Sequence, residues 1–386
     1  MSIKYIRRKY SREIRVFSKN IRALKERVLK LCVQSADKTC AECIKPFLLL
    51  FKLCGLFANK VTVGQVKRCS WSTYGICVFW IGLFVTCIYY LFLYLVKLKR
   101  IYLEITVHFA KHFLGCISLS ADVITAYSSQ NHFSKFFDRL DGYDYKVAQI
   151  KNKRRDNLWI PWIVALLLIF VSLLLVNVMR LTELVGDIFL SLLLDLCMMI
   201  IQMYSFLEKF LLLYLVLIRF RHLNKNIAPN VSWDEERREP NAIEISDVQI
   251  MYLMLYDAHK AFNDIYRYPL FLSFSFLMMC VVANLSIFRK GSASTACSLV
   301  CPPMMLILII SIICHCTTEE ANNITCVLNK SMTMLVHSGK TTTKISALTY
   351  FLHNCVSFDA AGFFTIDLPL FHSIVASLAT YFIILV

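Results

Sequence analysis

The residues of this sequence that could do chemistry are polar side chains placed inside long apolar stretches. Lys111 lies ~15 Å along the helix predicted over 101–130, and Asp195 lies ~10 Å into a later apolar run. A charge in the middle of a bilayer costs about 2.5 to 3.5 kcal/mol on insertion scales, so such groups are paired or face water. We therefore expect the two charges to pair with each other, to pair with Glu104 or His108, or to face a water-filled cavity.

These two charges allow two functional interpretations. In the first, they form an ion pair that only locks two helices together. In the second, they belong to the polar lining of an outward-open ligand pocket, with Gln202 deeper on the same face, and with aromatic and Met side chains as its apolar walls. The candidate ligand-binding residues are Lys111, Asn177, Asp195, Met199, Gln202, Phe276 and Asn284.

A second polar set lies in the last apolar stretch, 367–386, which reads DLPLFHSIVASLATYFIILV. The nineteen residues after the first carry no charge and, at ~1.5 Å each, span ~28 Å, about the thickness of a hydrocarbon core. Ser373, Ser377, Thr380 and Ile384 follow one another at helical spacing. Small hydroxyl residues of this kind serve either to pack helices closely or, as the sharper hypothesis, to form the wall of a pore.

Enzyme, metal and nucleic-acid chemistry receive little support. Cys314, His315 and Cys316 are adjacent, so on a helix they point in different directions and we predict no metal site. A membrane enzyme such as an acyltransferase would use an intramembrane histidine, His315 or His372, but no paired acid, base or nucleophile motif accompanies either. We predict no catalytic residue, no cofactor and no nucleic-acid partner, because the net charge of +16 comes without a nucleic-acid-binding motif.

The composition places the chain among polytopic membrane proteins. Apolar residues make up 58% and charged residues 18% of the sequence, and the mean hydropathy is +0.58. The segment 46–57 is too short to cross a bilayer, so we predict an interfacial or re-entrant helix there. The predicted spans are 71–96, 101–130, 158–179, 188–220, 268–288, 299–316 and 367–386.

The second predicted span has the strongest pattern of polar residues. Its polar and small residues recur every three or four positions, so this face must turn to the bundle interior or to water. In the fourth span, Glu208 and Lys209 lie ~30 Å along the helix, so we expect them to reach the far interface. The stripe of the second span consists of Glu104, His108, Lys111, Gly115, Ser118 and Asp122.

The segments between the spans are polar. We predict a loop over 131–157, a helical run over 243–266 and a helical piece over 345–358. The small residues 360–362 predict a break before the last span, which Asp367 begins as a capping residue, with Pro369 in the first turn.

The basic residues orient the spans. The predicted inner segments hold 34 Lys and Arg, whereas the predicted outer loops hold six, which favours a cytosolic N-terminus and an external C-terminus. The predicted fold is an all-α membrane protein with seven transmembrane helices and a cytosolic helical anchor. The predicted divisions are 1–70 (cytosolic, with the interfacial helix), 71–220 (four spans), 221–266 (anchor), 267–318 (two spans), 319–361 (anchor) and 362–386 (last span).

The ending TYFIILV resembles the terminal signature of the insect gustatory receptors, which is Thr-Tyr, five apolar residues and Gln-Phe. Thr380 and Tyr381 match, and residues 382–386 supply the five apolar positions. The Gln-Phe pair does not follow, because the sequence ends at Val386. The stretch AAGFFTIDLPLFHSIVASLA is also similar to the approach to the last span in that family.

This resemblance implies a ligand-gated, non-selective cation channel in the plasma membrane of sensory neurons. It implies a homo- or hetero-tetramer with other gustatory receptors, with the last span of each subunit around the pore and a small organic tastant as ligand. The ending is closer to the bitter-type members than to the sugar-type branch. The alternatives are a seven-span G-protein-coupled receptor, which the predicted orientation opposes, and a membrane-embedded enzyme.

Overall fold

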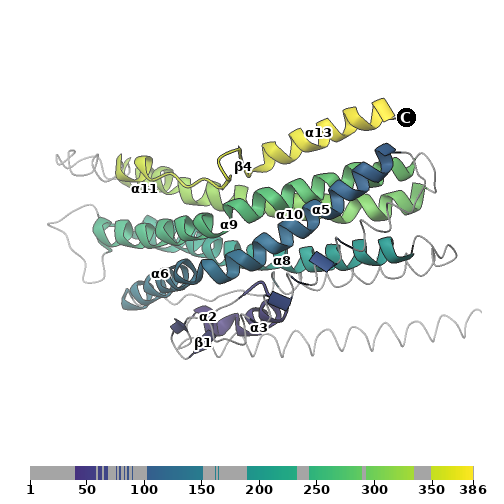
Figure 1. Cartoon of the computed structure of the whole chain (residues 1–386). Helices are drawn as coiled ribbons and strands as arrows, with labels where there is room; N and C mark the ends of the chain where they lie inside the picture. The colour runs from purple at the N-terminus through teal and green to yellow at the C-terminus, as the bar shows by residue number, and fades with distance from the viewer. Residues whose placement is uncertain are drawn as a thin grey trace, which may run out of the picture.

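The computed structural model is a bundle of long helices that run side by side (Figure 1). The predicted spans 71–96 and 158–179 lie almost wholly outside the described residues, as does Asn177. The described ranges are 40–57, 60–62, 65–67, 102–150, 189–232, 243–288, 293–333 and 349–385, with isolated positions between 75 and 89 and at 161 and 164.

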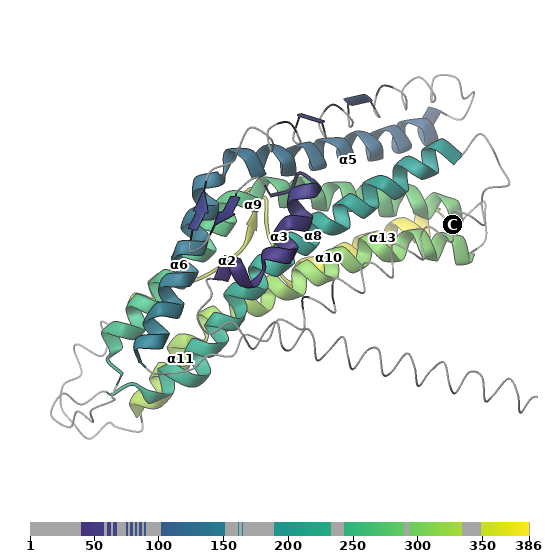
Figure 2. The same cartoon turned by 90° about the horizontal axis from the view of Figure 1, so that it is seen from below.

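The core of the bundle is formed by α5 (Tyr102–Ser128), α8 (Phe189–His222), α9 (Ile245–Phe288) and α10 (Ala293–Asn322), and α13 (Leu368–Leu385) lies along α9 and α10 (Figures 1 and 2). In the described part, three helical stretches are long and apolar enough to cross a membrane, and α13 is a shorter apolar helix. With 34 and 44 residues, α8 and α9 are ~51 Å and ~66 Å long, so both exceed a hydrocarbon core. The three membrane-length stretches are Met198–Asn230, Ile245–Leu285 and Leu299–Lys330. The chain is therefore an all-α membrane protein.

The orientation predicted for the polar stripe of α5 is confirmed where its side chains are described. Lys111, Ser118 and Asp122 are all buried against the other helices. Because α5 carries Lys111 and Asp122 along this face, burying the face inside the bundle is what makes the helix compatible with a membrane.

The prediction of a loop over 131–157 is wrong for the first two thirds of that range. Residues Gln130–Gln149 form a helix, α6, which follows α5 in the chain and bends away from it toward one end of the bundle (Figure 2). Six of the twenty residues of this segment are charged, but its apolar residues recur every three or four positions and form one buried face. These residues are Phe133, Phe136, Phe137, Leu140, Tyr143 and Val147.

The predicted fifth and sixth spans are shorter than the helices that contain them. The helical run over 243–266 and the fifth span are one continuous helix, α9, with Pro269 inside it. The helix α10 begins before Pro302 and Pro303, which therefore lie inside it and do not start it. In both helices the lost backbone hydrogen bonds are tolerated because the surrounding side chains hold the helix in place.

The short N-terminal elements pack on the outside of α6 and α8. They are α2 (Cys40–Cys43), α3 (Lys45–Leu53) and the hairpin of β1 (Lys60–Thr62) and β2 (Gln65–Lys67). The α3 helix has nine residues, too few to span a bilayer, as predicted for 46–57. Its buried Phe47, Leu48 and Phe51 show that it is held by protein contacts.

Beyond α8, the chain turns through a π-helical turn (Leu223–Ile227) and a short 3-10 turn (Ala228–Asn230). After α10, α11 (Ile324–Thr333) follows at the same end of the bundle (Figure 2). The helical piece predicted over 345–358 is wrong at its end, because the described helix stops at 353 and 354–358 are not helical.

The approach to the last helix follows the prediction. The strands β3 (Asp359–Ala360) and β4 (Phe364–Thr365) form a tight hairpin whose turn holds Ala361 and Gly362 at φ of 55° and 78°. Positive φ explains the glycine at 362, because glycine has no Cβ, whereas Ala361 bears the steric cost of an L-residue in this region. Asp367 then accepts a hydrogen bond from the Leu370 amide at 2.9 Å, which confirms the predicted cap of α13.

The burial of α6 generates a stability prediction. Leu140 is 0% exposed, so Leu140→Ala should lower the free energy of unfolding by about 2 to 5 kcal/mol. Tyr145 on the same helix is 67% exposed, so Tyr145→Ala serves as the control. The thermal midpoint of each detergent-solubilised variant measures the effect, and equal midpoints for the two variants would contradict the helical assignment of α6.

Candidate functional site

Three helices bury a small hydrogen-bonded group, which we call the serine layer: Ser118 of α5, Gln202 of α8 and Ser273 of α9. The Ser118 and Ser273 hydroxyl oxygens lie 3.1 Å apart, and Gln202 Nε2 donates to Ser273 Oγ at 2.8 Å. All three side chains are completely buried. The predicted ligand-binding residue Gln202 therefore belongs to a polar layer at the centre of the bundle.

Within the described residues, the side-chain amide of Gln202 is hydrogen-bonded through only one of its two polar atoms. Its Oε1 is buried and has no hydrogen-bond partner in the described part of the chain. An unsatisfied buried polar atom costs about 1 to 3 kcal/mol, and a water or the polar group of a ligand would satisfy it. The serine layer thus offers one open hydrogen-bonding position, whichever way the amide is turned.

An apolar wall lies one helical turn from the serine layer. A Cβ atom added at Gly115 would lie 2.8 Å from Phe276 Cε2 and 2.9 Å from Met198 Sδ, so α5 approaches α8 and α9 closely there. Phe276 is buried, and Met199 is partly buried against the core. The structure therefore brings Phe276 and Met198, the neighbour of the predicted residue Met199, to about one helical turn from Gln202.

A buried ion pair joins α5 to α8 deeper in the bundle. Lys209 Nζ lies 2.8 Å from Asp122 Oδ1, and Ser205 Oγ donates to Asp122 Oδ2 at 2.6 Å. Lys209 also donates to Ser205, and its ammonium lies 5.6 Å from the ring centroids of Phe206 and Tyr266. Since Lys209 is 0% exposed, its charge is compensated entirely within the protein.

This arrangement corrects the expectation for Glu208 and Lys209. Both were expected to reach the far interface, but both are buried. Asp122 on α5 supplies the counter-charge for Lys209, whereas Glu208 Oε1 is buried without a hydrogen-bond partner in the part of the chain that the structure describes. Distance along one helix does not predict exposure when neighbouring helices extend as far.

The other predicted ligand-binding residues are only partly placed. Lys111 is buried on α5, but the side chain of Asp195 on α8 is outside the described part, so their pairing stays a prediction. Asn284 does not join the serine layer, because its amide donates to the Leu299 carbonyl at 3.0 Å and ties α9 to α10.

Sequence reasoning missed three residues of this region: Ser205, Lys209 and Ser273. On α8, Gln202, Ser205 and Lys209 recur at spacings of three and four, which matches the stripe of α5. This matching periodicity is the signal that could have paired the two helices. Ser273 has no such signal, since it lies in an apolar run of α9.

The last helix has two different faces. Ile374, Leu378 and Phe382 pack toward Val281 and Leu285 of α9 in one apolar cluster. On the other side, the hydroxyls of Ser373, Ser377 and Thr380 are exposed, and each donates to the carbonyl four residues earlier. The side chain of Ile384 lies outside the described part, and Tyr381 is 37% exposed, at the edge of the hydroxyl face.

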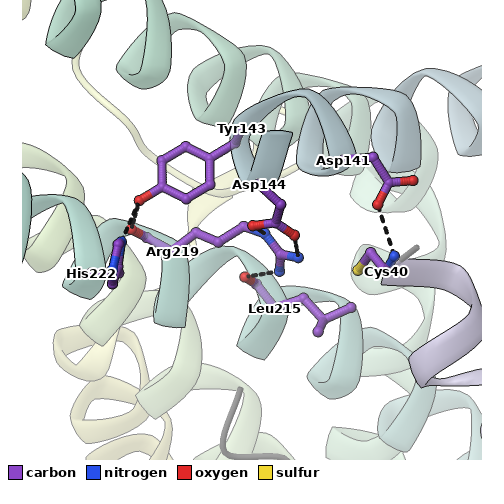
Figure 3. Close-up of polar contacts among 7 residues, drawn as sticks. All are labelled: Cys40, Asp141, Tyr143, Asp144, Leu215, Arg219 and His222. Carbon is purple, nitrogen blue, oxygen red and sulfur yellow. Dashed lines mark hydrogen bonds and ion pairs between the residues drawn. The ribbon is translucent and has the colours of Figure 1, made fainter. Parts of the chain in front are cut away.

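A second polar network joins α6 to α8 away from the serine layer (Figure 3). Arg219 is fully buried and donates to both carboxylate oxygens of Asp144, at 2.5 and 3.2 Å, and to the Leu215 carbonyl at 2.9 Å. Tyr143 donates to the Arg219 carbonyl at 3.1 Å, and its hydroxyl lies 3.0 Å from His222 Nδ1. A bidentate pair of this kind fixes the relative orientation of two helices.

Asp141 extends this junction to the N-terminal segment. Its carboxylate accepts a hydrogen bond from the Cys40 amide at 2.8 Å, which caps α2 (Figure 3). Burial raises the pKa of the Asp141 carboxyl, so it binds a proton at a higher pH in the folded chain than in the unfolded chain.

Hydrogen bonds from α9 and α10 hold the segment before α13. Tyr252 of α9 donates to the Asn354 carbonyl at 2.6 Å, and Asn263 donates to the Asp359 carboxylate at 2.6 Å. His259 Nε2 lies 2.9 Å from the Ser357 carbonyl. Asn322 of α10 makes a reciprocal pair with the backbone of Val356, at 2.9 and 3.0 Å. The start of α13 is therefore positioned by side chains from two other helices.

The structure described so far is a membrane helix bundle with a buried polar layer and a last helix that packs on one face. Sequence comparison identifies the family to which this bundle belongs. The chain belongs to the 7tm chemosensory receptor family, whose model matches residues 44–386. No curated protein matches the sequence.

The fold is similar to that of the insect olfactory receptor OR5 from Machilis hrabei. The structure of that receptor in complex with eugenol aligns with a TM-score of 0.66, and a second structure of it aligns with 0.68. In both, the identity is 15%, and the alignment covers 89% of this chain and 97% of the other. At this identity the likeness shows the fold.

The buried ion pair generates the prediction for this site. Lys209→Met leaves the Asp122 carboxylate buried without its counter-charge, so the variant should lose about 3 to 5 kcal/mol of stability. The double variant Asp122→Asn/Lys209→Met should recover most of the loss, because neither charge remains. Lys260→Met, at an exposed position of α9, is the control. Thermal midpoints in detergent measure the effect, and additive losses in the double variant would contradict the pairing.

Proposed function

We propose that the chain is one subunit of a gustatory, ligand-gated, non-selective cation channel, with a cytosolic N-terminus, an external C-terminus and a small organic tastant as its ligand. We propose that the protein acts in the plasma membrane of sensory neurons. Family membership supports a chemosensory receptor and not an enzyme. The ending TYFIILV, with Thr380 and Tyr381, supports the gustatory branch and, within it, a bitter-type ligand more than a sugar.

The observation that carries this proposal is the two-sided last helix. An uncharged helix that packs Ile374 and Leu378 on its own bundle yet exposes Ser373, Ser377 and Thr380 presents its polar side away from the subunit. Each hydroxyl already donates to a carbonyl of its own helix, but its oxygen can still accept a hydrogen bond from water, which lipid does not supply. Several such helices around one axis would enclose an aqueous pore with no fixed charge, which gives weak selectivity among cations.

Assembly into a homo- or hetero-tetramer is supported by exposed apolar side chains at the end of the bundle that carries α6. Ile250 and Leu253, one turn apart on α9, are 41% and 42% exposed, and Tyr145 of α6 and Leu352 are also exposed. Since α9 is longer than a hydrocarbon core, we place these residues in the cytosolic anchor region, where a second subunit would cover them.

The ligand site is proposed to be the serine layer with its apolar wall. The open hydrogen-bonding position of Gln202 would orient a polar group of the ligand, and Phe276 and Met199 would contact its apolar part. Eugenol, which the similar olfactory receptor OR5 binds, is a small organic molecule of this general kind. Lys111, Asp195, Asn177 and Asn284 remain proposed members of the pocket.

Expression of the full chain in cells with current and calcium recording tests the proposal. We expect an inward cation current in response to members of a panel of bitter compounds, sugars and eugenol. Gln202→Leu should shift the effective concentration of the best agonist about fivefold to tenfold, the worth of one hydrogen bond, at unchanged surface level. Gln149→Leu, at an exposed position of α6, is the matched control. Surface expression without any evoked current would overturn the channel proposal.

The pore face is tested by cysteine substitution along 370–386. A charged thiol reagent should reduce the current of Ser373→Cys, Ser377→Cys and Thr380→Cys, because these positions are exposed on one face. It should not reduce the current of Leu378→Cys, which is packed on the bundle. The reverse pattern, with block on the side of Leu378, would reject the assignment.

A further inference from the structure

We propose that Phe274 couples the serine layer to the last helix, so that a change at Gln202 reaches α13 through this one ring. The proposal rests on the proposed function, because it names the residue that would connect the ligand site to the pore helix. It concerns a positioning residue, since Phe274 belongs to neither site.

Phe274 lies between the serine layer and the hairpin that precedes α13. It directly follows Ser273 of the serine layer, and it is buried. Its ring centroid lies 6.4 Å from that of Phe206, one turn beyond Gln202 on α8, and 6.0 Å from that of Phe364 in β4. A shift between α8 and α9 at the serine layer must therefore be accommodated at Phe274, because cores packed to native density do not compress.

Phe364 is tied closely to the start of α13. Only Thr365 and Ile366 separate it from the capping residue Asp367, and the Ile366 amide donates to the Phe358 carbonyl at 2.9 Å. A displacement of the Phe364 ring therefore moves the cap, and with it the first turn of the last helix.

The two strands of the hairpin are held by different kinds of contact. The β3 side is fixed by hydrogen bonds, from Asn263 to Asp359 and between His259 and the Ser357 carbonyl. The β4 side meets α9 through the rings of Phe364 and Phe363, whose contacts with α9 are not directional. The β4 side is thus the side that can follow a movement of Phe274, with the turn at Gly362 as the hinge.

Thiol accessibility of the last helix tests this coupling without any current. In the purified full-length chain carrying Ser377→Cys, the rate of modification by a methanethiosulfonate reagent is measured by mass spectrometry on the peptide that contains position 377. Adding Gln202→Leu should change this rate about fivefold or more, the lower end of coupling between two sites, and with Phe274→Leu the same addition should change it less than about twofold. Phe274→Met, which retains an apolar side chain, replaces Phe274→Leu if the latter does not fold.

Phe271→Leu is the matched control. Its ring lies 4.7 Å from Phe363 and 6.2 Å from Phe364, so it contacts the same hairpin from the same helix. In this background the effect of Gln202→Leu should persist. The coupling is refuted if Gln202→Leu has no effect with Phe274 intact, if its effect persists in Phe274→Leu, or if Phe271→Leu abolishes it equally. Because the measurement needs no ligand and no current, a negative result leaves the channel proposal standing, and an absence of evoked current leaves this test valid.

Discussion

The ion pair between Asp122 and Lys209 is the interaction on which the arrangement of the bundle depends. A lysine with no exposure to water and an aspartate on a neighbouring helix are acceptable in an apolar bundle only when each satisfies the other. This requirement fixes the rotation of α5, because its polar stripe must face α8. The same rotation brings Ser118 to Ser273 and Gln202, so the serine layer follows from the position of the ion pair.

Helix α9 connects the parts of the molecule that carry function. It is one unbroken helix of 44 residues, with Pro269 inside it, so it joins the end of the bundle that carries α6 to the opposite end. Along this length it contributes Ser273 to the serine layer, holds the segment before α13 through Tyr252, His259 and Asn263, and supports the last helix through Val281 and Leu285. A single rigid element therefore contacts both the proposed ligand site and the proposed pore helix.

Much of the architecture could be predicted from local sequence signals. The apolar length of α8, the Asp367 cap of α13, the small residues of the hairpin turn and the inward direction of the α5 stripe follow from periodicity, capping and the cost of polar groups in lipid. The family was likewise identified from the ending of the chain, and the comparison confirmed it at the level of the chemosensory receptors. These signals act within one helix or one turn, so no other part of the chain is needed to interpret them.

Only the tertiary structure decided which side chains meet. A loop was predicted in place of α6 because the charged residues of this segment interrupt the apolar positions that α9 covers. Lys209 was expected at the interface because its partner, Asp122, lies on another helix. Packing also retains α9 and α10 as continuous helices through their internal prolines. Sequence by itself determined the elements and the faces that must be hidden, whereas burial and pairing depend on neighbours that are distant in the chain and that no local pattern specifies.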